Sequence, residues 1–507
     1  MISKLTSLSL TGLQGDLVDI ETVIHRGLPA FTIVGLPDAS IQEARERVRA
    51  AIKQSGFEFP RGKISLNLAP ANLKKQGPRF DLPIALGILE AHRQINVPET
   101  LKKALFLGEL SFNGDLRPIV GVLPSVHAAF EQGIKTVVLP AQNAEEAALI
   151  EGIEILGVKS LTQLCDYFVN KEGLVPQAFT GFEPPENKRT PAYDFQYVKG
   201  NALAKRGLEI AAAGGHNVLM NGPPGSGKTM LARAYSTILP ALTFSESLDI
   251  TKVHSIAGVL NASEPVLYQR PFRAVHHTAS GVAIVGGGNP PKPGEISLAH
   301  RGVLFLDEFA EFSAKTLEVL RQPLEDGVIR ISRASGSVSY PAQFSLVAAM
   351  NPCPCGFYQD PKKECLCAPF AVQRYRQKVS GPILDRIDVH LKVPRVEVSD
   401  LNKNELSEGS TLVQRRVQAA REWQLKRFAR TSVICNADMS SAQVQQWCVL
   451  NEEAQCLLNQ VVEKMQLSGR AYFRTLKLAR TIADLANEKS ILAAHIAEAV
   501  QYRASTT

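Results

Sequence analysis

The chain has 507 residues, of which 45% are hydrophobic and 21% are charged, and its formal net charge is +7 at pH 7. This length suggests about three domains of ~150 residues each, and the composition is typical of a globular protein. No apolar run reaches the ~18–20 residues that span a bilayer, and the N-terminus lacks the features of a secretory signal. We therefore expect a cytoplasmic protein with no membrane partner, whose modest positive charge permits a nucleic-acid partner without requiring one.

The first 170 residues alternate short β-rich runs with helical patterns. Residues 31–34 and 136–139 have the composition of strands, and residues 40–55 have the spacing of a helix. Residues 1–170 are therefore expected to form an α/β or α+β domain. Residues 171–192 are rich in proline, glycine and charge and carry no periodicity, so we interpret them as a linker.

A strand, a glycine-rich loop and a helix follow one another within residues 193–395, where strands alternate with helices as in a parallel sheet. The loop fits the phosphate-binding pattern G-x-x-x-x-G-K-[ST] at every fixed position. We expect its backbone N–H groups and the helix N-terminus to bind phosphate, Lys228 to contact the β- and γ-phosphates, and Thr229 to bind Mg²⁺. The predicted nucleotide-binding residues are Gly222, Pro223, Pro224, Gly225, Ser226, Gly227, Lys228, Thr229 and Met230.

Two later apolar runs end in polar residues, as strands do at the ligand-binding edge of a parallel sheet. The run at 302–308 ends in Asp307 and Glu308. We expect Asp307 to help hold Mg²⁺ and Glu308 to orient and deprotonate the attacking water. The run at 345–351 ends in Asn351, which is expected either to hydrogen-bond the γ-phosphate or the attacking water, or to cap a turn.

Eight cysteines without an export signal indicate reduced thiols or metal ligands rather than a disulfide framework. Four of them form two C-x-C pairs directly after Asn351, in a stretch rich in proline and glycine. Four thiolates suit a tetrahedral Zn²⁺ site, which would be structural because no coordination position stays open. The spacing is tighter than the usual one, so labile thiols, another metal or disulfides are the alternatives. The candidate zinc ligands are Cys353, Cys355, Cys365 and Cys367.

Residues 396–507 contain no convincing strand, and helical stretches at 411–430 and 475–487 dominate them, so we expect a small helical domain. The first of these stretches carries many basic residues. At ~100° per residue they spread around the helix, so a solvated helix is as good an interpretation as a DNA-binding face. These residues are Arg415, Arg416, Arg421, Lys426, Arg427 and Arg430.

Several longer motifs carry a family resemblance. They read HHTAS at 276–280, PGEISLAHRG at 293–302, LRQPLE at 320–325 and MNPCPCG at 350–356. Together with the phosphate loop, the acidic strand end and the segment ILDRIDV, they resemble the AAA+ ATPases and, among these, the ComM/YifB branch of the magnesium-chelatase-like family. The resemblance covers essentially the whole chain. It implies an α/β fold, with a parallel sheet flanked by helices over 193–395 and a helical lid over 396–507.

The resemblance also implies a ring in which ATP binds between subunits. By it, Arg386 corresponds to the arginine finger that reaches the γ-phosphate of the neighbouring subunit. A surface ion pair of Arg386 with Asp385 or Asp388 is the alternative. Arg474, at the start of the helix expected at 475–487, corresponds to the sensor arginine of the lid. Arg470 and Arg480 are alternative candidates for that role.

Two segments are expected to project into the pore of such a ring. The first, residues 285–296, is rich in glycine and proline and contains Lys292. The second, residues 330–339, has the pattern of a β-hairpin and contains Arg330 and Arg333. Small polar and basic tips suit contact with phosphates rather than with bases, so these residues are candidate DNA contacts. Ordinary connecting loops are the alternative interpretation.

Residues 107–124 and 133–140 resemble the proteolytic domain of Lon proteases, which implies a Lon-like α+β fold of the ribosomal S5 domain 2 type for residues 1–170. Lon needs a nucleophilic serine and an activating lysine. Here the serine motif has become GPRFDLP at 77–83 and the lysine position falls at Pro124, so we expect no peptidase activity. A small basic cluster is expected to touch DNA or a neighbouring subunit, or to form an exposed loop. It consists of Lys74, Lys75 and Arg79.

The resemblance implies an ATP-dependent hexameric DNA helicase that promotes branch migration during homologous recombination in natural transformation. ATP and Mg²⁺ are the expected cofactors, with structural Zn²⁺ as a further candidate. The expected partners are single-stranded and branched DNA and other copies of the chain, and recombination proteins are further candidates. One alternative is a chelatase-type motor that remodels a partner protein without acting on DNA. The other is a Lon-like protease, which the missing serine and lysine disfavour.

Overall fold

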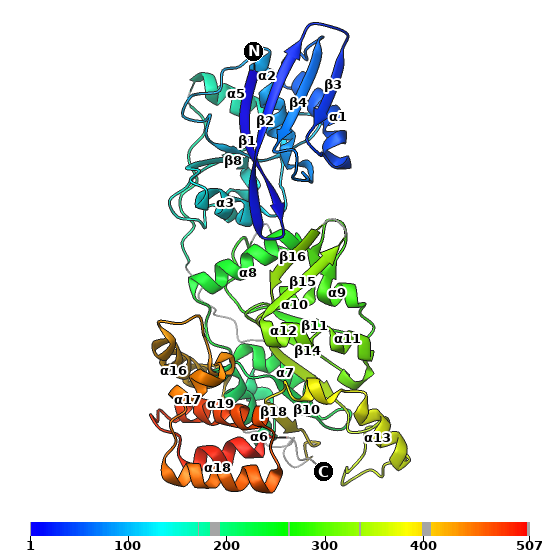
Figure 1. The fold of residues 1–507 in the computed structure, drawn as a ribbon, viewed down its shortest axis with the longest axis vertical. Helices are drawn as coiled ribbons and strands as arrows, with labels where there is room; N and C mark the ends of the chain where they lie inside the picture. Colours follow the sequence, from blue (N-terminus) through cyan, green and yellow to red (C-terminus); the bar gives the residue numbers. More distant parts are fainter. Residues whose placement is uncertain are drawn as a thin grey trace.

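The structure, a computed structural model, describes residues 2–170, 172–182, 193–261, 264–333, 336–397 and 407–503. Three parts follow one another along its long axis (Figure 1): an N-terminal domain, a central domain with a parallel sheet, and a group of C-terminal helices beside and below that sheet. Among the described residues, no helix is long and apolar enough to cross a membrane. Of the expected linker, residues 171 and 183–192 lie outside the described residues.

The N-terminal domain is built on a mixed sheet whose strand order, within the described residues, is β3-β4-β2-β1-β5-β8-β9. The central strands pair antiparallel, and both flanks pair in parallel. The strands are β1 (Ile2–Thr11), β2 (Gln14–His25), β3 (Ala30–Val34), β4 (Lys63–Ala69), β5 (Leu105–Phe106), β8 (Thr136–Pro140) and β9 (Glu154–Val158), with a small ladder of β6 (Glu109–Leu110) and β7 (Leu116–Arg117). The helices are α1 (Ala39–Gln54), α2 (Asp81–Ala91), α3 (Val122–Glu131), α4 (Ala144–Ala147) and α5 (Leu161–Asn170).

Local chemistry explains two of these helices. The carboxylate of Asp38 accepts a hydrogen bond of 2.9 Å from the backbone N–H of Ile41 and so caps α1. Every residue of α2 is buried, because this helix is apolar on all sides and lies inside the domain rather than on its surface. Both of its carboxylates are paired: Asp81 with Arg47 at 2.7 Å, and Glu90 with the hydroxyl of Ser3, which donates to it. The α+β fold expected for this domain is confirmed.

Of the expected basic cluster of the N-terminal domain, Lys74 is exposed, whereas Lys75 and Arg79 are not part of an exposed loop, which corrects that interpretation for these two residues. The side chain of Lys75 is fully buried, and its ammonium donates to the carbonyl oxygen of Pro70. The guanidinium of Arg79 donates to the hydroxyl of Ser125 and to the carbonyl oxygen of Val120, each at 2.9 Å. Burial lowers the pKa of Arg79 to about 10. Both cations stabilise the fold of this domain instead of facing a partner.

The central domain contains a parallel sheet with strand order β11-β14-β17-β10-β18 in the described part of the chain. Its strands are β11 (Phe272–Val275), β14 (Val303–Leu306), β17 (Ser345–Met350), β10 (Val218–Asn221) and β18 (Val389–Lys392), and two hairpins are formed by β12 (Gly286–Gly287) with β13 (Lys292–Pro293) and by β15 (Val328–Arg333) with β16 (Gly336–Pro341). The helices are α6 (Ala202–Gly214), α7 (Lys228–Thr237), α8 (Phe244–Ala257), α9 (Gly281–Val285), α10 (Glu295–Leu298), α11 (Ala314–Glu318), α12 (Arg321–Asp326), α13 (Pro369–Gln377) and α14 (Gly381–Leu384). Because the strands are parallel, all their carboxyl ends meet at one edge of the sheet.

The C-terminal helices pack on the central domain through a shared hydrophobic core. Leu208 of α6 and Val347 of β17 belong to the same buried cluster as Leu478 and Ile496 of the C-terminal part. The helices are α16 (Ser410–Phe428), α17 (Ser441–Trp447), α18 (Glu452–Met465), α19 (Gly469–Leu485) and α20 (Ala493–Gln501). The shared core positions these helices firmly against the sheet, as expected for a lid that belongs to the same ATPase unit.

The start predicted for the last long helical stretch is wrong. α19 begins at Gly469 rather than at residue 475, because the hydroxyl of Ser468 caps it by accepting a hydrogen bond of 3.3 Å from the backbone N–H of Ala471. Arg474 therefore lies inside the helix and does not open it.

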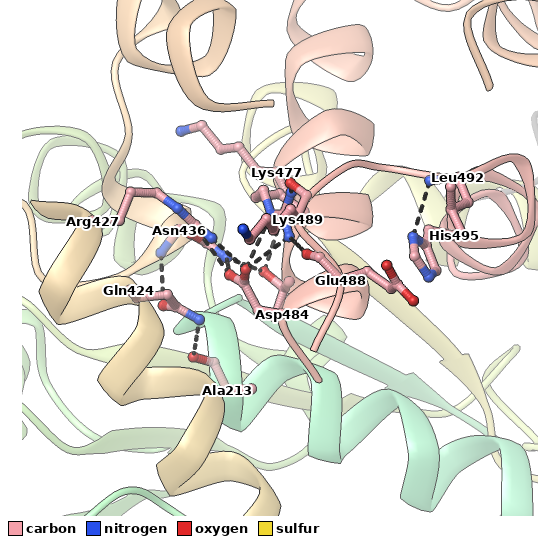
Figure 2. A network of polar contacts seen from close by, with 12 residues as sticks. Ala213, Gln424, Arg427, Asn436, Lys477, Asp484, Glu488, Lys489, Leu492 and His495 are labelled. Carbon is pink, nitrogen blue, oxygen red and sulfur yellow. Dashed lines mark hydrogen bonds and ion pairs between the residues drawn. The ribbon is translucent and has the colours of Figure 1, made fainter. Parts of the chain in front are cut away.

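A buried polar network ties α19 to its neighbours in the lid (Figure 2). The carboxylate of Asp484 accepts hydrogen bonds from Arg427 of α16 at 2.9 Å, from the amide of Asn436 at 2.8 Å and from Nε of Arg480 at 3.1 Å. The guanidinium of Arg480 also donates to the carbonyl oxygen of Lys489 at 2.6 Å, so this arginine is structural and does not serve as the alternative sensor. These contacts hold the lid helices in one arrangement.

Only part of the basic set on α16 is solvated: Arg415, Lys426 and Arg430 are exposed, whereas the other three make contacts within the fold. Arg416 is paired with Glu209 of α6 at 2.6 Å, and Arg421 is buried and donates to the carbonyl oxygen of Ala212 at 3.3 Å. With Arg427, half of the set is therefore used to join α16 to α6 and α19.

The N-terminal domain contacts the central domain at two places. The backbone N–H of Gly121, which precedes α3, donates to the carbonyl oxygen of Ser255 in α8 at 3.2 Å, and the hydroxyl of Ser255 donates to the buried carboxylate of Glu146 at 2.5 Å. The turn between β1 and β2 lies against β16, since a β-carbon added at Gly12 would come 2.4 Å from a methyl group of Val338. The β15–β16 hairpin is therefore in contact with the N-terminal domain.

Candidate functional site

The phosphate loop runs from the carboxyl end of β10 to the start of α7. Gly225 and Gly227 adopt positive φ angles of +75° and +89°, and a β-carbon added at either would meet nothing within 4 Å. The loop therefore has an open side, as a phosphate cradle needs. Gly222 is required for a different reason: its added β-carbon would lie 2.1 Å from the carbonyl oxygen of Val393, just beyond β18.

Lys228 is the first residue of α7, and its side chain lies back over the loop. Its ammonium donates hydrogen bonds to the carbonyl oxygens of Gly222 at 2.7 Å and Pro223 at 2.9 Å, and to Oδ1 of Asn351 at 3.2 Å. The residue is only 8% exposed, and burial lowers the pKa of Lys228 although the charge of Asp307 opposes the shift. The structure thus brings the predicted phosphate-binding lysine and the predicted sensor asparagine together.

The next residue, Thr229, meets the acidic end of β14. Its hydroxyl donates to Oδ2 of Asp307 at 2.8 Å, and Oδ1 of Asp307 accepts from the backbone N–H of Glu308 at 2.9 Å. A hydroxyl and a carboxylate at the end of a phosphate loop are the oxygen ligands that Mg²⁺ accepts beside nucleotide phosphates. The residues present therefore fit MgATP.

The side chain of Glu308 is half-exposed and faces a histidine pair. Its Oε2 lies 2.8 Å from Nδ1 of His277, whose ring lies 4.1 Å, centroid to centroid, from that of His276. Glu308 also has a φ of +52°, an unusual backbone conformation that clusters at functional sites. The sequence motif containing both histidines was noted, but their contact with Glu308 was missed. One feature of the sequence points to this contact: His276 and His277 directly follow β11, and β11 is the neighbour of β14 in the sheet.

A cavity of about 680 Å³ opens beside the loop. Its volume is in the range of small-molecule sites and suits a nucleotide. Besides the loop and Met230, it is lined by Tyr197, Asn201 and Arg395, which belong to no motif recognised in the sequence. They come from segments just before α6 and just after β18, so only the fold brings them to the loop.

The two predicted arginines lie at the opposite, amino-terminal edge of the sheet. The side-chain amide of Asn217, just before β10, donates to the carbonyl oxygen of Arg386 at 2.9 Å. The guanidinium of Arg386 is 5% exposed, donates to the carbonyl oxygen of Pro382 at 2.5 Å and is paired with Glu325. β10 separates this edge from the phosphate loop by about 13 Å at ~3.3 Å per residue. Arg386 therefore does not belong to the phosphate site of its own chain.

Arg474 lies at the same edge and pairs with Asp388 at 3.2 Å. Burial raises the pKa of Asp388, but the hydrogen bond from His216 and the charge of Arg474 outweigh it and hold that pKa well below its usual range. The structure brings Arg386 and Arg474 near one another through the segment 386–388, and away from Lys228. Their roles at a neighbour's nucleotide stay predictions.

The four candidate zinc ligands converge. The Sγ atom of Cys353 lies 3.4 Å from that of Cys355 and 3.7 Å from that of Cys365, and Cys355 and Cys365 are 3.6 Å apart. With Cys367, all four sulfur atoms lie within 4.8 Å of one another. A tetrahedral site with ~2.3 Å Zn–S bonds separates its sulfur atoms by about 3.8 Å, so this arrangement fits a metal ion.

The candidate DNA contacts lie on the two hairpins of the central domain. Lys292 in β13 and Arg330 in β15 are exposed, and Arg333 ends β15 next to a tip that lies outside the described residues. The hydroxyl of Tyr340 in β16 donates to the carbonyl oxygen of Pro291 at 2.9 Å, which joins the two hairpins. Their basic residues therefore belong to one neighbourhood of the domain.

Comparison with known proteins shows to which family the chain belongs. A profile described as magnesium chelatase, subunit ChlI, matches residues 194–401, one for subunit ChlI of Mg-chelatase matches residues 20–143, and one for the ChlI C-terminal region matches residues 407–503. The chain is 43% identical over 501 residues to the competence protein ComM of Haemophilus influenzae, covering 97% of this chain and 96% of that protein. It belongs to the ComM/YifB family of magnesium-chelatase-like AAA+ proteins. The predicted resemblance is confirmed.

A second relative gives the same result. YifB of Escherichia coli is 43% identical over 494 residues, covering 97% of this chain and 95% of that protein. Membership of this AAA+ family makes the chain an ATPase that uses ATP and Mg²⁺. Lon protease 2 of Bacillus subtilis is 33% identical over 123 residues, which are 24% of this chain and 21% of that protein. This match agrees with the Lon-like fold of the N-terminal domain of this ComM/YifB-family protein.

Proposed function

We propose that this protein is a hexameric ring ATPase that moves along DNA and promotes branch migration during recombination in natural transformation. The observation that carries the proposal is the near full-length similarity to a protein named for competence, combined with a well-formed phosphate site. Its substrates are single-stranded and branched DNA in the cytoplasm. Recombination proteins are further candidate partners.

The catalytic roles follow from the arrangement at the carboxyl edge of the sheet. Lys228 neutralises the phosphates, Thr229 and Asp307 hold Mg²⁺, and Asn351 contacts the γ-phosphate from beside Lys228. Glu308 turns from His277 to the attacking water and accepts its proton. When bound, Mg²⁺ neutralises charge on the β- and γ-phosphates.

The proposed ring is supported by the residues at the opposite edge of the sheet. Arg386 and Arg474 are separated from their own phosphate loop by the length of β10, yet the charge that develops on a transferred phosphoryl group needs a cation beside it. A neighbouring chain that packs its phosphate-loop edge against this edge receives both arginines. Arg386 first has to leave Glu325, its present partner. A closed hexamer repeats this contact around an axis without leaving a free end.

DNA contact is assigned to the joined hairpins. Lys292, Arg330 and Arg333 supply positive charge on the strands of the two short hairpins. Contacts to the phosphate backbone carry no sequence information and weaken with salt. Binding is therefore expected to be independent of sequence and to fall steeply between low and moderate salt.

We further propose that Cys353, Cys355, Cys365 and Cys367 hold one structural Zn²⁺. The close spacing of their sulfur atoms supports this assignment over disulfides, since each thiol is free and has several sulfur neighbours. With four sulfur ligands the ion has no open position for catalysis.

One second function has support of its own. The three magnesium-chelatase profiles favour a motor that remodels a partner protein without acting on DNA. ATPase rates of the full chain with and without single-stranded and forked DNA, together with displacement of a labelled strand, separate the two. Stimulation by DNA with strand displacement is expected. A rate indifferent to DNA, with no displacement, would sink the helicase proposal in favour of the partner-protein motor.

The same assay can include casein as a substrate. No digestion is expected, because the position of the Lon nucleophile motif is occupied by the segment containing Arg79, whose guanidinium binds Ser125. Digestion that persists in the purified protein would restore the protease alternative.

A further inference from the structure

The loop that carries the four cysteines, residues 353–367, begins directly behind the phosphate site. Asn351, which directly follows β17, accepts a hydrogen bond from Lys228 at 3.2 Å. Cys353, two residues later, is fully buried. From there to α13 the chain contains no helix or strand, and Leu366 is 89% exposed. The cysteine loop thus has little hydrophobic core of its own to fix its conformation.

A first contact joins this loop to the phosphate loop. Gly356 has a φ of +84°, and a β-carbon added there would lie 2.4 Å from Cδ and 2.7 Å from Cγ of Pro224. The backbone at Gly356 therefore lies directly against the ring of Pro224. Since Pro224 is two residues from Ser226 and four from Lys228, this contact supports the part of the loop that curls around phosphate.

A second contact joins the cysteine loop to Arg395, another residue that lines the cavity beside the phosphate loop. The guanidinium of Arg395, which lines that cavity, lies over the ring of Phe357 at 5.2 Å from its centroid. Nε of Arg395 is also 3.5 Å from Oδ2 of Asp360. The cysteine loop therefore contacts two of the residues that line the cavity beside the phosphate loop, Pro224 and Arg395.

We propose that the metal ion bound by the four cysteines controls the affinity of the nucleotide site. This inference rests on the proposed zinc assignment. The ion crosslinks the two ends of the cysteine loop, and thereby fixes Gly356, Phe357 and Asp360 where they support Pro224 and Arg395. Without the ion, the four sulfur atoms lose their common ligand and the loop samples many conformations. ATP binding then has to order the loop again, which reduces affinity.

The test measures metal content and nucleotide affinity of the full chain, without DNA. Zinc is quantified by elemental analysis, and a fluorescent ATP analogue reports the Kd. The wild type is measured before and after chelation and after Zn²⁺ is restored. We expect one Zn²⁺ per chain, at least about tenfold weaker binding after chelation, and recovery with Zn²⁺. The variant C365S/C367S should lack the metal and bind weakly even after Zn²⁺ is added.

Two further variants make the test independent of misfolding. Gly356→Ala keeps all four ligands but forces a side chain against Pro224, so it should retain Zn²⁺ and still bind the analogue more weakly. Cys456→Ser, at an exposed position on α18, is the matched control and should change neither quantity.

The outcomes separate this inference from the proposed function. A chain that binds no metal, or a folded metal-free chain with unchanged Kd, overturns it. So does a zinc-loaded Gly356→Ala variant with wild-type affinity. Because no DNA is present, a protein that fails to act on DNA can still show the metal-dependent affinity.

Discussion

The hydroxyl of Thr229 donates a hydrogen bond of 2.8 Å to Oδ2 of Asp307. The two residues come from the start of α7 and the end of β14, so the contact depends on the parallel sheet bringing both to one edge. In the proposed ATPase site, these two residues hold Mg²⁺. Arg386 and Arg474 lie at the other edge, so binding of ATP and its rapid hydrolysis should be separable by mutation.

The first prediction concerns the base. Glu308→Gln removes the carboxylate that accepts a proton from water but leaves Thr229 and Asp307 intact. ATP should bind with unchanged affinity, while hydrolysis falls by about 10²–10⁴. Binding of a fluorescent nucleotide and release of phosphate measure the two effects. Glu311→Gln is the matched control, because Glu311 is an acid close by that pairs with Lys378 at 3.0 Å, and it should hydrolyse ATP normally. Normal turnover by Glu308→Gln would show that another group acts as the base.

The second prediction tests whether the finger acts between chains. Arg386→Ala should bind ATP but hydrolyse it ~10³–10⁵ times more slowly, and Lys228→Ala should not bind ATP. Mixing the two inactive variants creates sites with Lys228 from one chain and Arg386 from the next. Phosphate release by the mixture should exceed that of either variant alone. A mixture as inactive as its components would argue against a shared site.

Prediction from the sequence worked best where the chemistry is local. The phosphate loop, the acids after β14 and Asn351 after β17 were found because each follows an apolar strand, and parallel strands end at one edge. Because both residues lie at this edge, Nζ of Lys228 comes within 3.2 Å of Oδ1 of Asn351. The cysteine cluster was found because all its ligands lie within one short segment.

The remaining features depend on pairings between distant segments. The contact of His277 with Glu308 requires knowing that β11 lies next to β14, and the buried pairs of Arg416 and Arg427 require the packing of α16 on α6 and α19. A basic residue looks the same in sequence whether it faces solvent or a buried carboxylate. The true start of α19 depends on the cap at Ser468, whose hydroxyl accepts a hydrogen bond from the backbone N–H of Ala471.

The third prediction concerns the stability of the lid. Asp484→Ala leaves the guanidinium groups of Arg427 and Arg480 without their shared carboxylate (Figure 2). Removing one partner of a buried ion pair costs about 3–5 kcal/mol, so the free energy of unfolding should fall by that amount. Denaturant unfolding followed by circular dichroism measures it. Glu422→Ala on the exposed side of α16, where Glu422 accepts only from Gln418 at 3.2 Å, should change stability by less than about 0.5 kcal/mol. Equal stability of the two variants would contradict this role for Asp484.

The fourth prediction is a dependence of stability on pH. Burial, followed by the charges of Arg301 and Arg270, lowers the pKa of His300 to about 3, and the ring accepts a hydrogen bond of 3.2 Å from the backbone N–H of Gln343. In the unfolded chain this histidine titrates near ~6.5, so between these values the unfolded state binds more protons. Stability should therefore fall as the pH drops below about 6.5, by up to ~1.4 kcal/mol per pH unit from this group.

Melting temperatures from pH 7 to pH 4 test this slope. His300→Asn retains an acceptor near the position of Nδ1 but cannot be protonated in this range, so the variant should lose less stability on acidification than the wild type, whatever its stability at pH 7. His390→Asn is the companion variant, because burial also lowers the pKa of His390, to about 4. The His390→Asn variant should also lose less stability on acidification than the wild type, over the same pH range. Parallel melting curves for the wild type and both variants would mean that neither imidazole is held neutral by burial.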